Sequence, residues 1–243
     1  MGSIIFDWDG TIISCEEKIN GAIAHLCTMY PQLAEDYRRS VLSEKQSPGW
    51  WRKGVQVALP EDYFCHHFGI VTDLLSAMLT VDRDEAWNIA LTSFKTTYCD
   101  YPSTLMLPKA LLDELANRLP VYILSNSSSD NIQKEALDHN ILTGITFVGG
   151  AKKYSVSSDE TLLCGISPNR PGYLNKLLEI QKEHGDILVI GDNFSLDIST
   201  PLSQGMQCAY IPNPFSPPHV INYLRGRNVR IGSAIDIVSE LIK

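Results

Sequence analysis

Two short acidic clusters carry the residues in this sequence that are best suited to chemistry. Asp7 and Asp9 follow the apolar run Ile4 to Phe6, whereas Asp192 and Asp197 follow Ile187 to Ile190. We interpret both runs as buried parallel strands, which would bring the carboxylates to one edge of a sheet. Carboxylates held close together repel unless a cation neutralises them, and all-oxygen clusters prefer magnesium or calcium over zinc. The pattern favours a site for a hard divalent cation.

Each acidic cluster also has an ordinary structural explanation when it stands alone. Aspartate is common in solvated turns after strands, and Gly10 lets the chain turn sharply after the first pair. In the second cluster a turn followed by a helix N-cap explains one aspartate, at Asp192 or Asp197, without any function. These explanations do not account for both clusters at the same predicted edge.

Two further segments would bring polar groups to that edge. Ser125 and Asn126 follow the apolar run Val121 to Leu124 at the start of a predicted helix, a place that binds anions well. The same sequence is also an ordinary helix cap. Arg170, followed by Pro171, precedes the helix that leads to the second acidic cluster and offers a cation. An exposed arginine before a helix is usually only solvated.

Strand-like and helix-like segments alternate along most of the chain, which predicts an α/β fold with a Rossmann-like, doubly wound parallel sheet. The helical spacing is found at Leu111 to Arg118, Asn131 to His139 and Tyr173 to His184. The predicted strands are Ile4 to Phe6, Val121 to Leu124, Ile145 to Val148, Ile187 to Ile190 and Cys208 to Ile211.

The connection from the first strand to the second is too long for one crossover helix, because more than a hundred residues separate Gly10 from Val121. This stretch has its own helical patterns at Glu16 to Tyr30, Asp73 to Leu79 and Arg83 to Tyr98, with breaks at prolines and glycines. We therefore predict an inserted α-helical domain at residues 15–101 and a core domain formed by residues 1–14 and 102–243.

Length, charge and cysteine content narrow the class of protein. A chain of 243 residues supports one or two domains, and a net charge of −8 leaves no basic surface for a nucleic acid. The six cysteines include no CxxC pair, and neither a secretory signal nor a membrane-spanning run is visible. We expect a cytoplasmic protein, monomer or homodimer, that binds a small phosphorylated substrate and neither nucleic acid nor membrane.

Taken in order, these motifs resemble those of the haloacid-dehalogenase-like (HAD) hydrolases. They are Asp7-Trp8-Asp9-Gly10-Thr11, Leu124-Ser125-Asn126-Ser127-Ser128, Arg170-Pro171 and Gly191-Asp192-Asn193-Phe194-Ser195-Leu196-Asp197. The helical insertion is similar to the cap domain of the phosphoglycolate phosphatase and β-phosphoglucomutase branch. The resemblance covers essentially the whole chain and implies a five-stranded parallel core with a mobile helical cap.

The resemblance also implies a role for each motif. Asp7 would be the nucleophile that forms an aspartyl-phosphate, and Asp9 the acid and base. Dehalogenase relatives lack an aspartate at the second position, so Asp9 favours phosphoryl chemistry. Mg²⁺ would be bound by Asp7, Asp192 and the backbone carbonyl of Asp9, with Asp197 either near the ion or orienting the basic residue.

The same resemblance assigns the phosphoryl contacts. Ser125, with Asn126 beside it, would hydrogen-bond the transferring group. The family's usual lysine before proline is Arg170 here, which differs in geometry, and Lys176 in the following helix is the alternative cation. The implied activity is a magnesium-dependent phosphatase.

The insertion would select the substrate, since the core chemistry involves only the phosphoryl group. Trp50, Arg52 and Lys53 lie in a turn-rich stretch, Ser47 to Gly54, that suits a lid over a polar phosphorylated substrate. The same stretch also fits an interhelix turn whose tryptophans pack inside the cap.

Three other activities stay open at this point. A phosphomutase uses the same motifs. A phosphonatase would need a cap lysine, for which Lys18, Lys45 and Lys53 are candidates. A catalytically silent, phospho-ligand-binding relative would keep the fold without turnover.

Overall fold

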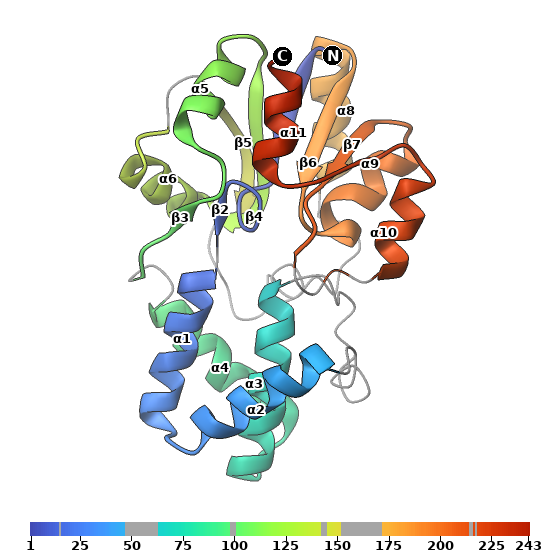
Figure 1. The fold of residues 1–243 in the computed structure, drawn as a ribbon. Coiled ribbons are helices and arrows are strands. Elements are labelled where there is room, and N and C mark those ends of the chain that lie inside the picture. Colours follow the sequence, from blue (N-terminus) through green and yellow to red (C-terminus); the bar gives the residue numbers. More distant parts are fainter. Residues whose placement is uncertain are drawn as a thin grey trace.

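The computed structural model describes residues 1–14, 16–46, 63–97, 101–141, 145–151, 172–213, 216 and 218–243. The chain forms a sheet covered by helices, with a separate group of helices beyond the carboxyl ends of the strands (Figure 1). Both termini lie at the opposite end of the sheet from this group (Figure 1). Among the described residues, none of the helices is both long and apolar enough to cross a bilayer.

The main sheet is parallel throughout, with strand order β5-β4-β1-β6-β7-β8. All five predicted strands lie in it. The resemblance implied only five strands, whereas the described sheet has a sixth, β8, which is two residues long and too short to give an alternating pattern in the sequence. The strands are β1 (Ser3–Phe6), β4 (Val121–Ser128), β5 (Ile145–Ala151), β6 (Ile187–Gly191), β7 (Gln207–Tyr210) and β8 (Arg230–Ile231).

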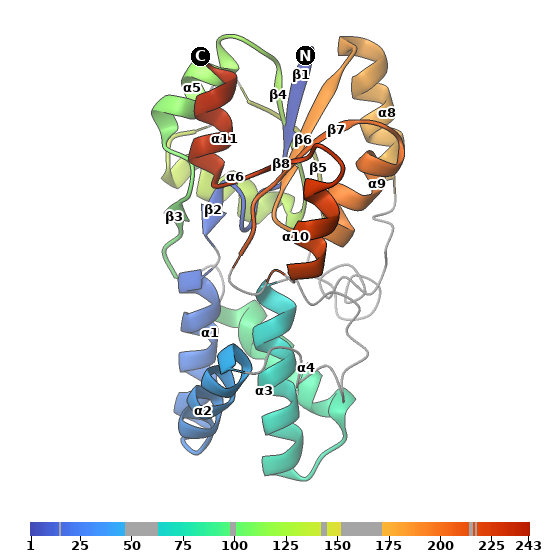
Figure 2. The ribbon, with the colours of Figure 1, turned by 45° about the vertical axis from the view of Figure 1, so that its right-hand side comes forward.

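The strands are apolar on both faces because helices cover both faces of the sheet. In β1, Ile4 and Phe6 pack into one apolar cluster and Ile5 into another, as the alternation of side chains along a strand requires. The first cluster lies under α5 (Lys109–Ala116), α6 (Ser129–Asp138) and α11 (Ala234–Leu241). The opposite face is covered by α8 (Tyr173–His184), α9 (Ser199–Ser203) and α10 (Pro218–Arg225) (Figure 2).

The three helices predicted for the core are present, and α8 has the predicted bounds. Helices α5 and α6 each begin two residues earlier than predicted. Helices α10 and α11 were not predicted. A short antiparallel pair, β2 (Ile13–Ser14) and β3 (Thr104–Leu105), lies where the chain leaves and re-enters the core.

Four helices form the separate group beyond the carboxyl ends of the strands, and we call this group the cap. They are α1 (Glu16–Met29), α2 (Leu33–Gln46), α3 (Tyr63–Leu79) and α4 (Arg83–Thr97). Their apolar side chains form a cluster separate from those of the sheet, built from Ile19, Ala22, Ile23, Leu26, Leu33, Val71, Leu75, Ala86, Ala90 and Phe94. This cluster confirms an inserted helical unit, while its predicted limits at residues 15 and 101 stay a prediction.

Two of the cap helices differ from the sequence prediction. Helix α3 begins ten residues before the predicted start at Asp73. Helix α2 was missed because it is rich in charged residues, although Leu33, Tyr37 and Val41 recur at helical spacing in its sequence. Exposed ion pairs one turn apart, such as Arg38 to Glu35, also accompany this helix.

Candidate active site

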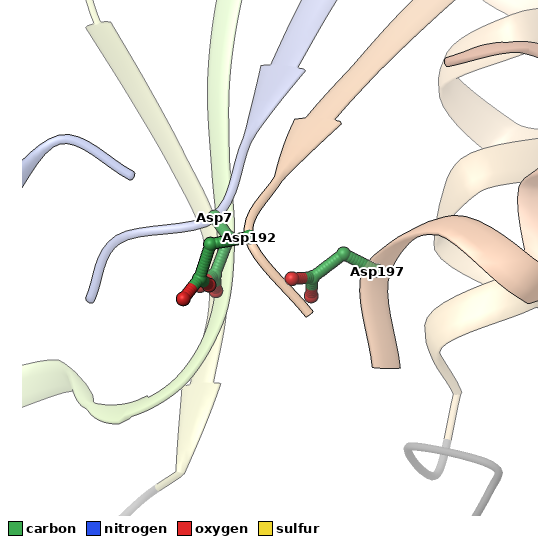
Figure 3. A group of neighbouring side chains, drawn as sticks. All are labelled: Asp7, Asp192 and Asp197. Carbon is green, nitrogen blue, oxygen red and sulfur yellow. The ribbon is translucent and has the colours of Figure 1, made fainter. Parts of the chain in front are cut away.

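Three buried aspartates meet at the carboxyl edge of the sheet, on the side that faces the cap. The carboxylates of Asp7, Asp192 and Asp197 each offer an oxygen, and these oxygens lie within 4.8 Å of one another. Their exposed fractions are only 7%, 8% and 1%. Figure 3 shows Asp7 and Asp192 pointing the same way from adjacent strand ends, with Asp197 directed toward them from the side.

Strand pairing explains why Asp7 and Asp192 are neighbours. Strands β1 and β6 are adjacent and in register, with Phe6 opposite Ile190. The backbone N–H of Asp7 continues this ladder by donating to the carbonyl of Ile190 at 3.0 Å. The residue that follows each strand therefore emerges at the same place, as predicted from the two apolar runs.

Asp197 is positioned by the local structure that follows β6. A single π-helical turn, η3 (Phe194–Ile198), begins after Asn193, whose side chain accepts a hydrogen bond from the N–H of Leu196 at 3.0 Å. The N–H of Asn193 donates to the Asp197 carboxylate, also at 3.0 Å. This turn directs Asp197 back toward the strand end, and π-helical turns often occur at functional sites.

Two glycines provide the space for this close approach. A side chain at Gly10 would place its Cβ 2.3 Å from a carboxylate oxygen of Asp192, and a Cβ at Gly191 would lie 2.5 Å from a carboxylate oxygen of Asp197. Gly10 also has φ of 77°, a left-handed conformation that other residues adopt at a cost. Both positions therefore need glycine for the aspartates to converge.

The donor set fits a hard divalent cation. Two ligands on opposite sides of one Mg²⁺ are about 4.2 Å apart, and of one Ca²⁺ about 5 Å apart, so oxygens within 4.8 Å can share one ion. Three buried carboxylates without a cation would repel one another strongly. All the donors are oxygens, which disfavours zinc and copper.

Asp9 lies beside this cluster but its carboxylate is not one of the three that converge. The residue is half-buried in the turn after β1, where Gly10 N–H donates to the carbonyl of Ile13 at 2.7 Å. The sequence assigned only its backbone carbonyl to the metal, and this assignment stays a prediction.

Ser125 is buried inside β4, which lies next to β1 and continues to Ser128, so Ser125 is not at the start of a helix as predicted. Its hydroxyl oxygen accepts a hydrogen bond from the N–H of Ser127 at 3.2 Å, so the hydroxyl proton can be donated elsewhere. Asn126 follows it in β4, and its side chain lies outside the described part of the structure.

Of the remaining predicted site residues, the structure describes only Lys176, on α8. Arg170, Trp50, Arg52 and Lys53 lie outside the described residues. The alternative cation, Lys176, lies on α8 and forms an ion pair with Glu179. The hydroxyl of Tyr173, at the start of α8, donates to the backbone carbonyl of Asp197 at 3.1 Å, which places this end of α8 against the site.

Glu135 is a buried acidic residue that the sequence analysis did not single out. It accepts a hydrogen bond from the indole N–H of Trp8, the residue between Asp7 and Asp9, at 2.6 Å. The signal was present in the sequence, because Glu135 is at helical spacing from Ile132 and next to Ala136 on the buried face of α6.

Two cysteines whose thiols are described do not take part in the site. Burial raises the pKa of the Cys208 thiol to about 12 and also raises that of Cys27. Both thiols therefore stay protonated at neutral pH and neither is an activated nucleophile. The chemistry of the described site depends on carboxylates.

A comparison with family models gives the class of this protein. The model for haloacid dehalogenase-like hydrolases matches residues 1–201. The chain belongs to this family, and it is an enzyme of the hydrolase class. A search of curated proteins by sequence gave no match.

Solved structures with the same fold cover nearly all of the chain at low sequence identity. A protein from Haemophilus somnus, predicted to be a phosphoglycolate phosphatase, has TM-score 0.57 and 15% identity, covering 99% of this chain and 98% of that one. A Thermotoga maritima protein assigned as a β-phosphoglucomutase has TM-score 0.54 and 15% identity, with coverages of 99% and 98%. A HAD hydrolase from Bacillus subtilis with bound magnesium has TM-score 0.53 and 18% identity, with coverages of 86% and 88%.

Proposed function

We propose that this enzyme is a magnesium-dependent phosphatase that hydrolyses a small phosphorylated metabolite through an aspartyl-phosphate on Asp7. The convergence of Asp7, Asp192 and Asp197, with Asp9 two residues beyond Asp7, is the observation that carries the proposal. A stable fold has no need to bury three carboxylates at one point, because each costs free energy unless it is compensated. A bound cation and a negatively charged substrate explain the arrangement.

The first half of the proposed reaction forms the aspartyl-phosphate. A carboxylate oxygen of Asp7 attacks phosphorus, the bond from phosphorus to the ester oxygen breaks, and the leaving oxygen takes a proton from the Asp9 carboxyl. The half-buried position of Asp9 is consistent with this exchange, since a residue that donates and recovers protons needs some access to solvent.

The second half releases phosphate. Asp9, now ionised, accepts a proton from water while the water oxygen attacks the phosphorus bound to Asp7. The bond from phosphorus to the Asp7 oxygen breaks, which regenerates both carboxyl groups and frees inorganic phosphate. Each proton that Asp9 donates is therefore recovered within one turnover.

Other groups of this chain would hold the charged reactants together. Asp7, Asp192, Asp197 and the carbonyl of Asp9 would hold Mg²⁺, which neutralises the carboxylates and the phosphoryl oxygens so that two anions can meet. Ser125 would donate its hydroxyl proton to a phosphoryl oxygen. Arg170 would supply the cation of the third motif, with Lys176 as the alternative. The solved magnesium complex of the Bacillus subtilis hydrolase supports this choice of ion.

A phosphomutase is the second candidate, because the Thermotoga maritima structure is assigned as a β-phosphoglucomutase. A mutase would transfer the phosphoryl group from Asp7 to another hydroxyl of the sugar phosphate, without net release of phosphate. The phosphonatase and the silent binding protein have no described residue that favours them. A phosphonatase would require a cap lysine free to form a Schiff base, whereas the described Lys18 is buried in an ion pair.

The first experiment is hydrolysis of p-nitrophenyl phosphate with and without Mg²⁺, followed by a panel of sugar phosphates, phosphoglycolate and nucleotides. A phosphatase releases inorganic phosphate from the aryl ester and from at least one metabolite, only when Mg²⁺ is present. Isomerisation of a sugar phosphate without phosphate release would identify the mutase. No turnover and no aspartyl-phosphate with any of these compounds would overturn both.

A further inference from the structure

Glu135 joins the core and the cap through a buried network. It is only 4% exposed and lies on α6, which packs against β4 and β5. Its carboxylate accepts hydrogen bonds from Trp8 Nε1 at 2.6 Å and from Asn131 Nδ2 at 3.2 Å. The same carboxylate forms an ion pair with Lys18, a 1% exposed residue in the first turn of cap helix α1.

Trp8 connects this network to the two aspartates that flank it. The indole is 1% exposed, and its N–H is fixed by Glu135. The backbone carbonyl of Trp8 accepts from the N–H groups of Ile12 and Ile13 at 2.9 and 3.1 Å, which closes the turn that contains Asp9. Because Trp8 is anchored at both its side chain and its backbone, it limits the directions in which Asp7 and Asp9 can point.

Asn131 connects the network to the neighbouring strand end. Its amide Nδ2 also lies 3.3 Å from the hydroxyl of Ser127, whose backbone N–H donates to the hydroxyl of Ser125 at 3.2 Å. Glu135 is therefore linked to β1 through Trp8 and to β4 through Asn131. Both strand ends carry residues with proposed roles in phosphoryl transfer.

Stability alone does not account for an ion pair at this place. Removing both charges from water is costly, and replacing a buried pair by apolar residues of similar size is often neutral or stabilising. A glutamate that held no particular geometry would thus be a poor choice for the buried face of α6. The structure favours an orienting role, which an apolar side chain could not perform because it cannot accept hydrogen bonds.

We propose that Glu135 is a positioning residue that orients Asp7 and Asp9 through Trp8, and that Lys18 of the cap supplies the charge that allows a carboxylate to be buried there. The effect of Glu135 on turnover rests on the proposed function. The effect of Glu135 on the rigidity of the turn after β1 is independent of that function, since it can be measured without any substrate.

The decisive comparison uses two double variants in which both charges are removed together, so that neither partner is left buried and unpaired. Lys18→Met with Glu135→Gln keeps an oxygen that can accept from Trp8, whereas Lys18→Met with Glu135→Met keeps only the volume. We expect the glutamine variant to stay within about 3-fold of the wild-type kcat on p-nitrophenyl phosphate, and the methionine variant to lose about 10- to 100-fold with little change in KM.

Hydrogen exchange of the turn at residues 9–13 gives the readout that is independent of activity. Exchange should be faster in the methionine variant than in the wild type and the glutamine variant. Trp8→Phe removes the same hydrogen bond without touching the ion pair, and it should reproduce both the loss of kcat and the faster exchange. This single variant also serves if the methionine variant does not fold.

A control is the partly exposed ion pair between Arg83 and Asp73, which lies entirely within the cap with a distance of 2.8 Å. Replacing it by Met and Asn should lower the melting temperature and leave kcat unchanged. Equal kcat and equal exchange in the glutamine and methionine variants would overturn the positioning role of Glu135. A wild-type enzyme without phosphatase activity would overturn the proposed function instead, and the exchange measurement would still decide the role of Glu135.

Discussion

The core and the cap bury very different kinds of polar side chain. In the described part of the chain, every buried carboxylate belongs to the core: Asp7, Glu135, Asp192 and Asp197. The described cap buries three hydroxyl residues, Thr72, Ser93 and Thr97, together with the cation Lys18. Burying an ionised group costs far more than burying a hydroxyl that can bond to a nearby carbonyl. Of these three hydroxyls, that of Thr97 donates to the carbonyl of Ser93 at 2.9 Å.

This difference indicates a division of labour. Under the proposed function, a cation and a phosphoryl group bound at this edge of the core would offset the cost of burying the carboxylates there. The described cap is held together by apolar packing, and under the proposed function its exposed surface would be the part that varies with the substrate. Lys18 is the described exception, and its partner is a core residue rather than a cap residue.

Removal of metal should produce the largest difference between the two regions. In excess chelator we expect phosphatase activity to be lost and the core to be destabilised by repulsion among the three carboxylates, while the cap is little affected. Restoring Mg²⁺ to 100 times its Kd should stabilise the native protein by about 2.7 kcal/mol. Calcium should bind but inhibit, because its larger and more flexible coordination sphere disturbs in-line geometry. Full activity in chelator would contradict the metal site.

Alanine at Gly10 should have the next largest effect, and Gly205 provides a matched control. Both glycines have positive φ, 77° and 74°, so alanine costs each about 1 to 2 kcal/mol of backbone strain. Only at Gly10 would the new Cβ collide with Asp192, since nothing lies within 4 Å of the one at Gly205. We expect Gly10→Ala to lower kcat about 100-fold or more, by misplacing a metal ligand.

Gly205→Ala should lower the melting temperature by the amount that the backbone strain alone causes, and it should leave kcat unchanged. Thermal unfolding and steady-state kinetics on the same preparations separate the two effects. If both variants lost activity equally, the strain and not the collision would be responsible, and the close approach of Gly10 to Asp192 would have no catalytic meaning.

The smallest expected effect concerns the cap stretch Ser47 to Gly54, which was predicted from sequence to contact the substrate and lies outside the described residues. Replacing Arg52 and Lys53 together by Ala should lower kcat/KM for the natural substrate about 10- to 100-fold. The loss on p-nitrophenyl phosphate should be much smaller, because this ester offers few groups to the cap. Equal losses on both substrates would indicate general damage to the cap instead.

Much of the core could be predicted from the sequence because its signals are local. The runs Ile4 to Phe6 and Ile187 to Ile190 are strongly apolar, and each is followed at once by aspartate. Parallel pairing then necessarily brings the two sets of carboxylates to one edge. Asp197 was harder to place, since its approach depends on the π-helical turn η3, which has no clear sequence signature.

The features that sequence analysis missed depend on contacts between distant segments. Helical spacing places Glu135 on the same face of α6 as Ile132, but its partner Trp8 is 127 residues away, and the sequence gives no sign of their contact. Lys18 was considered only as a candidate Schiff-base lysine, and its burial against Glu135 could not be seen without the fold. Helix α2 was missed for a different reason, because its many charged residues obscured the helical spacing of Leu33, Tyr37 and Val41.

Trapping the phosphoryl group on Asp7 tests the central claim most directly. The wild-type enzyme would be mixed with p-nitrophenyl phosphate and Mg²⁺, quenched in acid within one turnover, digested, and analysed by peptide mass spectrometry, with Asp7→Asn treated in parallel. The account predicts one phosphoryl group on the peptide that contains Asp7, no label in chelator, and neither label nor turnover in Asp7→Asn. Wild-type rates in Asp7→Asn, or a phosphoryl group found on another residue during turnover, would contradict it.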